Sequence, residues 1–97
     1  MNTTLITIRE AAQFVLNDTS DSATHYLRVR TENLNVLLRV SAVSNMLLTG
    51  REVARDSDGF VGVTDRLHCI SLDLIRWVKV IAHDHKYGEF TTIKEAK

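Results

Sequence analysis

Proline is absent from this 97-residue sequence, which permits long uninterrupted helices and strands but points to no activity. Cysteine occurs only once, as Cys69, and therefore cannot form a disulfide within the chain. The first residues lack the positive and apolar regions of a secretory leader. We therefore expect the protein to work in a reducing compartment, the cytoplasm.

Neither sign of charge is in excess, because the 12 basic side chains are matched by 12 acidic ones. The balance is also local: residues 1–48 carry four of each sign, and residues 51–97 carry eight of each. Nonspecific affinity for nucleic acids comes largely from clustered Lys and Arg side chains that neutralise phosphates. The even mixing therefore disfavours such binding, although it leaves room for a small basic face.

Long hydrophobic runs are missing as well. The best candidate, 70–82, is shorter than the roughly 20 apolar residues of a membrane-spanning helix, and it contains Asp73, Arg76 and Lys79. We therefore expect no integral membrane segment. Hydrophobic residues make up 44% of the chain and charged residues 25%, which is typical of a folded protein, and we expect a single domain over 1–97.

The clearest helix signal lies near the start of the chain. Thr7 and Glu10 have the spacing of a capping box, in which each side chain accepts a hydrogen bond from the other residue's amide. Helix-forming and apolar residues follow, and then the short polar residues of 17–22 favour a loop. The pattern predicts a helix over 7–17.

Residues 25–48 fit two secondary structures, because apolar and polar residues alternate with a period of two while several apolar residues also share a helical face. We favour a strand over 25–30 followed by an apolar helix over 32–48, with Gly50 in the left-handed position beyond the helix end. The alternative is that the alternation continues as a further strand.

Residues 51–64 give the strongest hairpin signal, since β-branched flanks surround Asp58-Gly59, which suits a tight turn. Gly62 indicates a bulge or a close neighbour within the second strand. A helix over 71–87, capped by Ser71 and followed by Gly88, is favoured over a long strand.

These elements predict an α+β fold, in which helices at 7–17, 32–48 and 71–87 pack on a small antiparallel sheet that includes the 51–64 hairpin. The polar tail, 91–97, is expected to fray.

Residues that could carry out chemistry are few and scattered. His83 and His85 would point to the same side of a strand and could share a metal ion, but on the predicted helix they diverge. Cys69 lies between Leu67 and Ile70, a setting that favours burial over nucleophilic attack, and the side chain of its immediate neighbour His68 usually points the other way. We therefore predict no catalytic residue, no metal and no cofactor, and keep metal binding through His83 and His85 as a remote alternative.

DNA binding is the principal alternative function, because 7–30 can be read as the two helices of a helix-turn-helix. The linker is long for that motif, and 26–30 fits a strand at least as well, which would leave two arginines on a solvated strand face. In the DNA-binding interpretation the contacting residues would be Thr24, His25, Arg28 and Arg30.

Protein interaction is the leading hypothesis, because the apolar faces exceed what one small core should need. We expect a non-enzymatic regulatory or binding protein that forms a homo-oligomer and contacts a protein partner. Aromatic anchors, apolar contacts and charged rim residues would form the interface. The residues predicted for these roles are Trp77, Tyr87, Arg76, Lys79, Val36, Val40, Val43 and Leu47.

Overall fold

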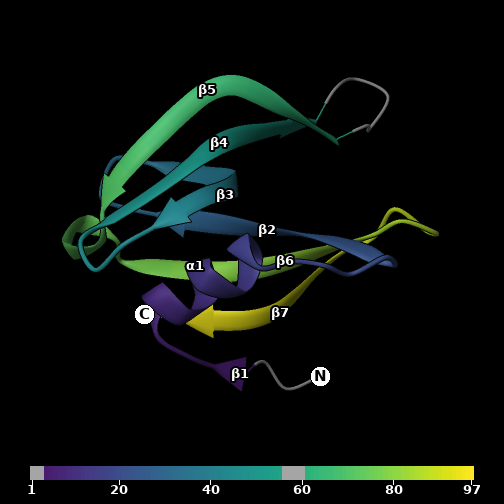
Figure 1. The fold of residues 1–97 in the computed structure, drawn as a ribbon, viewed down its shortest axis with the longest axis horizontal. Coiled ribbons are helices and arrows are strands. Elements are labelled where there is room, and N and C mark those ends of the chain that lie inside the picture. The colour runs from purple at the N-terminus through teal and green to yellow at the C-terminus, as the bar shows by residue number, and fades with distance from the viewer. Residues whose placement is uncertain (1–3, 56–60) are drawn as a thin grey trace.

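The computed structural model describes residues 4–55 and 61–97, and within these ranges one α-helix packs on a seven-stranded sheet (Figure 1). The strand order is β1-β7-β6-β2-β3-β4-β5, and all neighbours are antiparallel except the β1–β7 pair. The elements are β1 (Thr4–Leu5), α1 (Ile8–Leu16), β2 (Ala23–Arg30), β3 (Asn35–Val43), β4 (Leu47–Arg55), β5 (Val61–Ser71), the 3-10 turn η1 (Leu72–Leu74), β6 (Trp77–Asp84) and β7 (Phe90–Ala96).

The first helix begins at the predicted capping box. The Glu10 amide donates to Thr7 Oγ1 at 3.1 Å, and the Thr7 amide donates to Glu10 Oε1 at 3.4 Å. Helix α1 then runs over 8–16, which confirms the prediction for 7–17 to within one residue at each end. The strand predicted over 25–30 is also present, as the later part of β2.

The two other predicted helices are wrong. Residues 32–48 form β3 and the start of β4, and 71–87 contain η1 and β6. The reason lies in the pairing of β2, which is hydrogen-bonded to β3 on one side and along its full length to β6 on the other. The predicted sheet with three helices is therefore replaced, over the described residues, by an extensive, mainly antiparallel sheet with one α-helix and a 3-10 turn. Burial follows the alternation of a strand, not a helical stripe, since Val36, Leu38 and Val40 are all buried.

Gly50 is not a helix cap but lies within β4, opposite Val40. A Cβ atom added there would lie 2.9 Å from the carbonyl oxygen of Arg39, so glycine permits the close approach of β3 and β4. The β3–β4 register shifts between Val40 and Ala42, immediately beside this contact. The sequence suggested a bulge or a close neighbour at Gly62. In the structure an added Cβ at Gly62 would meet nothing within 4 Å, and the close neighbour is found at Gly50 instead.

The predicted 51–64 hairpin is confirmed in its two strands, because β4 and β5 pair antiparallel. Its turn residues, Asp58 and Gly59, lie outside the described residues. The prediction that 91–97 frays is wrong, since most of this segment belongs to β7, which pairs with β6. A polar sequence is held there by backbone hydrogen bonds to a neighbouring strand, which the local sequence does not encode.

The main core lies between α1 and one face of the sheet. Ala11, Ala12 and Val15 of α1 are almost fully buried, and they pack in one cluster with alternate residues of the central strands. The fully buried sheet residues of this cluster are Leu27, Val29, Leu38, Leu48, Val78 and Val80. Figure 1 shows α1 on one side of the sheet; we call the other side the open face. Within the described ranges, no helix is both long enough and apolar enough to cross a membrane.

Candidate functional site: a groove on the open face

The open face contains three buried side chains that do not belong to the main core: Tyr26, Val53 and Ile81. Tyr26 and Ile81 are directly paired across β2 and β6. Tyr26 alternates along β2 with Leu27, which belongs to the α1-side cluster, and therefore points away from the helix. Side chains buried without help from α1 indicate that the sheet itself shelters part of the open face.

A groove of about 550 Å³ lies over this part of the sheet. Val53 and Ile81 form a buried apolar floor, and Arg28 and Arg55 are among the lining residues. Residues of five strands contribute to it: Arg28 of β2; Asn35, Val36 and Leu37 of β3; Glu52, Val53, Ala54 and Arg55 of β4; Ile81 of β6; and Phe90 and Thr92 of β7.

A contact between Arg55 and Phe90 shows how a sheet can form a groove. The Arg55 guanidinium carbon lies 4.5 Å from the centroid of the Phe90 ring. Three strands separate β4 from β7 in the sheet order, so their backbones would be roughly 19 Å apart in a flat sheet with strands about 4.8 Å apart. Side chains that stand perpendicular to a flat sheet could not make this contact. The sheet therefore curls toward its open face, and Arg55 and Phe90 meet across the curl.

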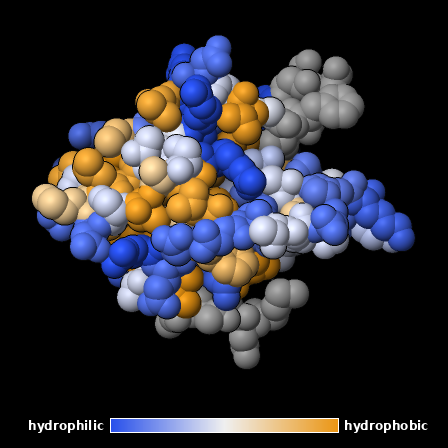
Figure 2. Space-filling view, viewed as in Figure 1, coloured by the Kyte–Doolittle hydropathy of each residue, from blue (hydrophilic) through white to orange (hydrophobic). Residues whose placement is uncertain are grey.

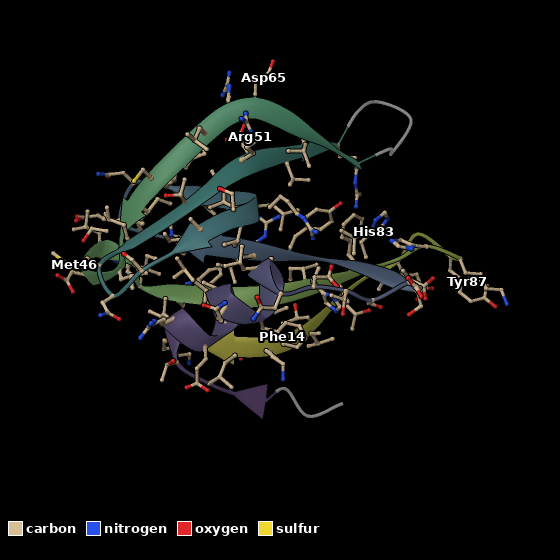
Figure 3. The ribbon with its side chains drawn as sticks, in the orientation of Figure 1. Phe14, Met46, Arg51, Asp65, His83 and Tyr87 are labelled. Atoms are coloured by element: carbon tan, nitrogen blue, oxygen red, sulfur yellow. The ribbon has the colours of Figure 1, made fainter. Side chains whose placement is uncertain are left out.

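His83 supports this side of the groove. Its ring stacks on Phe90 with centroids 4.4 Å apart, so that Phe90 is covered by an imidazole and by the Arg55 guanidinium. Figure 3 shows His83 on the side of β6 that faces the end of β4. The stacking holds the Phe90 ring in place, because a guanidinium and an aromatic ring attract each other through the charge and the ring quadrupole.

The groove is electrostatically suited to an anion. Arg28 donates to the Asn35 side chain at 3.1 Å, and no carboxylate of the described residues lies within 4 Å of it. Glu52 is the acidic residue in the lining, but its carboxylate is engaged by His68 at 3.2 Å and by Arg66 at 3.8 Å. Among the described residues, the positive charge of Arg28 is therefore not neutralised by an acidic side chain and can pair with a ligand.

A second polar cluster lies where α1 leads into β2, and its centre is Asp18. The Asp18 side chain is only 5% exposed, and its carboxylate accepts hydrogen bonds from the amides of His25 and Ser20 and from the Arg39 guanidinium, at 2.8, 3.1 and 3.3 Å. Burial by itself raises the pKa of this carboxyl, but the hydrogen bonds from His25, Ser20 and Arg39 outweigh it and hold the pKa well below its usual range. Asp18 therefore acts as an ionised structural group that fastens the end of the helix to the sheet.

His25 belongs to the same cluster, which gives it a structural role. Its Nδ1 lies 2.8 Å from Asp18 Oδ1, close enough for an ion pair when the ring is protonated, although the atoms are not aligned for a hydrogen bond. The ring packs edge-on against Phe14 of α1, with centroids 5.1 Å apart. His25 therefore lies on the helix side of the sheet, away from the open face.

The helix-turn-helix interpretation of 7–30 is wrong, because its second half is the strand β2. Of the residues predicted to contact DNA, Thr24, Arg28 and Arg30 alternate along β2 and share the open face, whereas His25 points to the opposite side. The basic pair therefore lies on one partly exposed strand face, as the alternative interpretation of 26–30 indicated.

The residues predicted to form a protein interface are not brought together. Val36 and Val40 are buried in the core, Val43 packs against it, and Leu47 is 45% exposed at the start of β4. Arg76, Trp77 and Lys79 lie at the start of β6, where the Lys79 ammonium is 4.9 Å from the Trp77 ring centroid. Tyr87 is exposed and lies beyond the other end of β6, a strand that spans roughly 23 Å from Trp77 to Asp84 at 3.3 Å per residue. It forms one tip of the molecule in Figure 3.

The predicted histidine pair is also separated in its contacts. His83 stacks on Phe90, whereas the His85 ring bonds to Thr24 Oγ1 at 2.6 Å and to the carbonyl oxygen of Asp21 at 3.0 Å. His85 thus ties the β6–β7 turn to the start of β2. Over 4–55 and 61–97 no three His, Cys, Asp or Glu side chains gather as a metal site would require.

Sequence reasoning missed Val53, Arg55, Ile81 and Phe90. Alternation along β4 and β6 could have placed Val53 and Ile81 on a strand face, but the meeting of Arg55 with Phe90 has no local signal. Comparison with known protein families, with curated proteins and with solved structures finds no match to this chain. The geometry of the groove therefore carries the functional inference.

Proposed function

We propose that this chain is a non-enzymatic, cytoplasmic binding protein that holds an acidic, partly apolar segment of a partner protein in the groove of its open face. The observation that supports this function is the combination of an apolar floor, Val53 and Ile81, with the available guanidinium group of Arg28. The reducing compartment is supported by the single cysteine, Cys69, which is free and exposed.

The chemistry of the lining defines the ligand. Arginine matches the planar geometry of a carboxylate with two parallel N–H donors, and such charge-assisted bonds are stronger than neutral ones. Apolar side chains of the partner would bury the floor, and the Asn35 and Thr92 side chains supply further polar groups at the groove. Glu52 adds little repulsion because its charge is paired with His68 and Arg66.

The proposal is tested with a fluorescent peptide of alternating Glu and Val residues, titrated with the purified protein. We expect the wild type to bind it and Arg28→Glu to bind it at least roughly tenfold more weakly, since a charge pair becomes a charge repulsion. Arg9→Glu is the matched control, because it makes the same charge change at an exposed position of α1. A peptide in which Lys replaces Glu should not bind.

Equal affinity of the Arg28→Glu and Arg9→Glu proteins for the acidic peptide would contradict the proposal, and so would equal binding of the Lys peptide. Circular dichroism of each variant confirms that the fold is retained, which is expected because Arg28 is partly exposed and makes a single side-chain bond among the described residues.

Single-stranded nucleic acid is the second candidate ligand. Arg28 and Arg30 of β2 share the open face, and their cross-strand partners on β6 are Lys79 and Trp77, a mixture of basic and aromatic side chains typical of such surfaces. The groove favours the protein partner, because the aromatic rings of this face are already covered and cannot readily stack on bases. Tyr26 is buried, Lys79 covers the Trp77 ring, and both Arg55 and His83 cover the Phe90 ring.

An oligonucleotide titration at several salt concentrations separates the two ligands. Binding to nucleic acid should weaken steeply with salt and should be lost in Arg30→Glu, which lies outside the groove lining. Binding of the acidic peptide should tolerate the Arg30→Glu change.

A further inference from the structure

The outermost strand of the sheet, β5, has a free edge. It covers 11 residues and is paired with β4 on one side only, whereas the strand at the opposite edge, β1, has two residues. Its outward amide and carbonyl groups have no backbone partner among the described residues. Long edge strands are sites where another strand can pair, and natural proteins usually cover or interrupt them.

Several of the exposed side chains of β5 are apolar. Val63 is 52% exposed and Leu67 is 58% exposed, and Cys69, on the same strand face as Leu67, is exposed too. Exposed Met46, Leu47 and Leu74 lie near the end of β5, and Figure 2 shows hydrophobic side chains gathering toward this end of the molecule. A partner that covers this edge must supply both backbone hydrogen bonds and apolar side chains.

The sequence of β5 is suited to pair with itself. The β4–β5 register shifts between Arg51 and Val53, so β5 has two regularly paired stretches, 61–63 and 67–71, of which 67–71 is the longer. Two antiparallel copies centred on His68 would place Leu67 opposite Cys69 twice and Arg66 opposite Ile70 twice. A centre at Asp65 or Arg66 would oppose like charges, which destabilises cross-strand pairs.

His68 can occupy the centre of this pairing, opposite the His68 of the other copy, because each ring contacts Glu52 of the neighbouring strand β4. The His68 Nε2 lies 3.2 Å from Glu52 Oε1, so the ring already has a carboxylate partner within each copy. The net charge of the chain is zero, so two copies do not repel each other at long range. We propose that two copies of this chain form a dimer by antiparallel pairing of β5 with β5, with Leu67 of one copy opposite Cys69 of the other.

This dimer is independent of the groove. It is tested by sedimentation equilibrium of two variants, each with a lysine in place of one exposed apolar residue. The wild type is expected to be dimeric at micromolar to millimolar concentrations, and Leu67→Lys should dissociate at least roughly tenfold more readily because it buries two unpaired charges. Tyr87→Lys is the control, because Tyr87 is 70% exposed but lies in the β6–β7 turn, away from β5. Leu67→Lys should still bind the acidic peptide, so failure of the dimer and failure of the groove are distinguishable.

Disulfide formation tests the register. In Leu67→Cys the new thiol should form an intermolecular disulfide with native Cys69 under mild oxidation, giving a covalent dimer, whereas Thr92→Cys on β7 should not. A wild type that stays monomeric over the whole concentration range would overturn the proposal, as would a dimer that Leu67→Lys and Tyr87→Lys weaken equally. Failure of Leu67→Cys to cross-link would overturn the proposed register.

Discussion

Replacement of Gly50 by alanine should destabilise the protein even though it adds a single methyl group. The added Cβ would lie 2.9 Å from the Arg39 carbonyl oxygen and 3.2 Å from the Leu38 Cβ. The first contact is with backbone, and Leu38 is fully buried in the core, so neither neighbour can rotate away. Relief requires β3 and β4 to separate by a few tenths of an ångström, next to the bulge that already shifts their register.

The expected magnitude combines two opposing effects. Overpacking of a close contact costs about 1–3 kcal/mol, whereas exchange of glycine for alanine stabilises by about 0.4–1 kcal/mol because the unfolded chain loses freedom. The free energy of unfolding should therefore fall by about 1–2 kcal/mol, and the melting temperature should fall by about 4–8 °C for each kcal/mol in a chain of this size.

Gly62 provides the matched control within the same hairpin. A Cβ added at Gly62 meets no atom within 4 Å, so Gly62→Ala retains the effect on the unfolded chain without the clash. Thermal and urea unfolding of the two variants should show Gly50→Ala destabilised and Gly62→Ala unchanged or slightly more stable than the wild type. Equal stability of the two variants would refute the assignment of Gly50 to a close strand contact.

Two further predictions concern the ends of α1. Asp18→Asn should lower the free energy of unfolding by about 1–3 kcal/mol near neutral pH, because it removes the charge that Arg39 and His25 face. The folded-state pKa of Asp18 is depressed, so its contribution is fully present above the unfolded-state pKa of about 4 and is lost as pH falls further. Urea unfolding should therefore show the gap between wild type and Asp18→Asn narrowing from about pH 6 to about pH 3, and a constant gap would contradict the ionised state. Thr7→Ala should destabilise by about 1 kcal/mol in thermal unfolding, because the Glu10 amide loses its cap, while Thr7→Ser should restore most of the stability.

Elements whose signal is contained within a few consecutive residues were predictable. The capping box at Thr7 and Glu10 fixes the start of α1, because both hydrogen bonds form between residues three apart. The strands of the 51–64 hairpin follow from β-branched residues on both sides of a turn. The segments 32–48 and 71–87 were not predictable, because an apolar run without proline fits a helix or a strand, and neighbouring strands decided between them.

The candidate site depends on contacts that no local pattern contains. Sequence alternation places Arg28 and Arg30 on one strand face, and that part of the surface could be anticipated. The groove itself requires the sheet to curl until Arg55 reaches Phe90, although the two residues belong to strands separated by three others. Likewise, the carboxylate of Asp18 becomes a buried anchor only because β2 and β3 bring His25 and Arg39 beside it.

The sequence by itself determined one capped helix, one hairpin, a chain balanced in charge, and the absence of any internal disulfide. Tertiary structure decided that most of the remaining chain is a single sheet, that one face of this sheet is open and grooved, and that β5 ends it with an edge that no other described strand pairs. The physical reason is that helix caps and turns are stabilised by neighbours in sequence, whereas strands are stabilised by partners that only the folded chain brings into register.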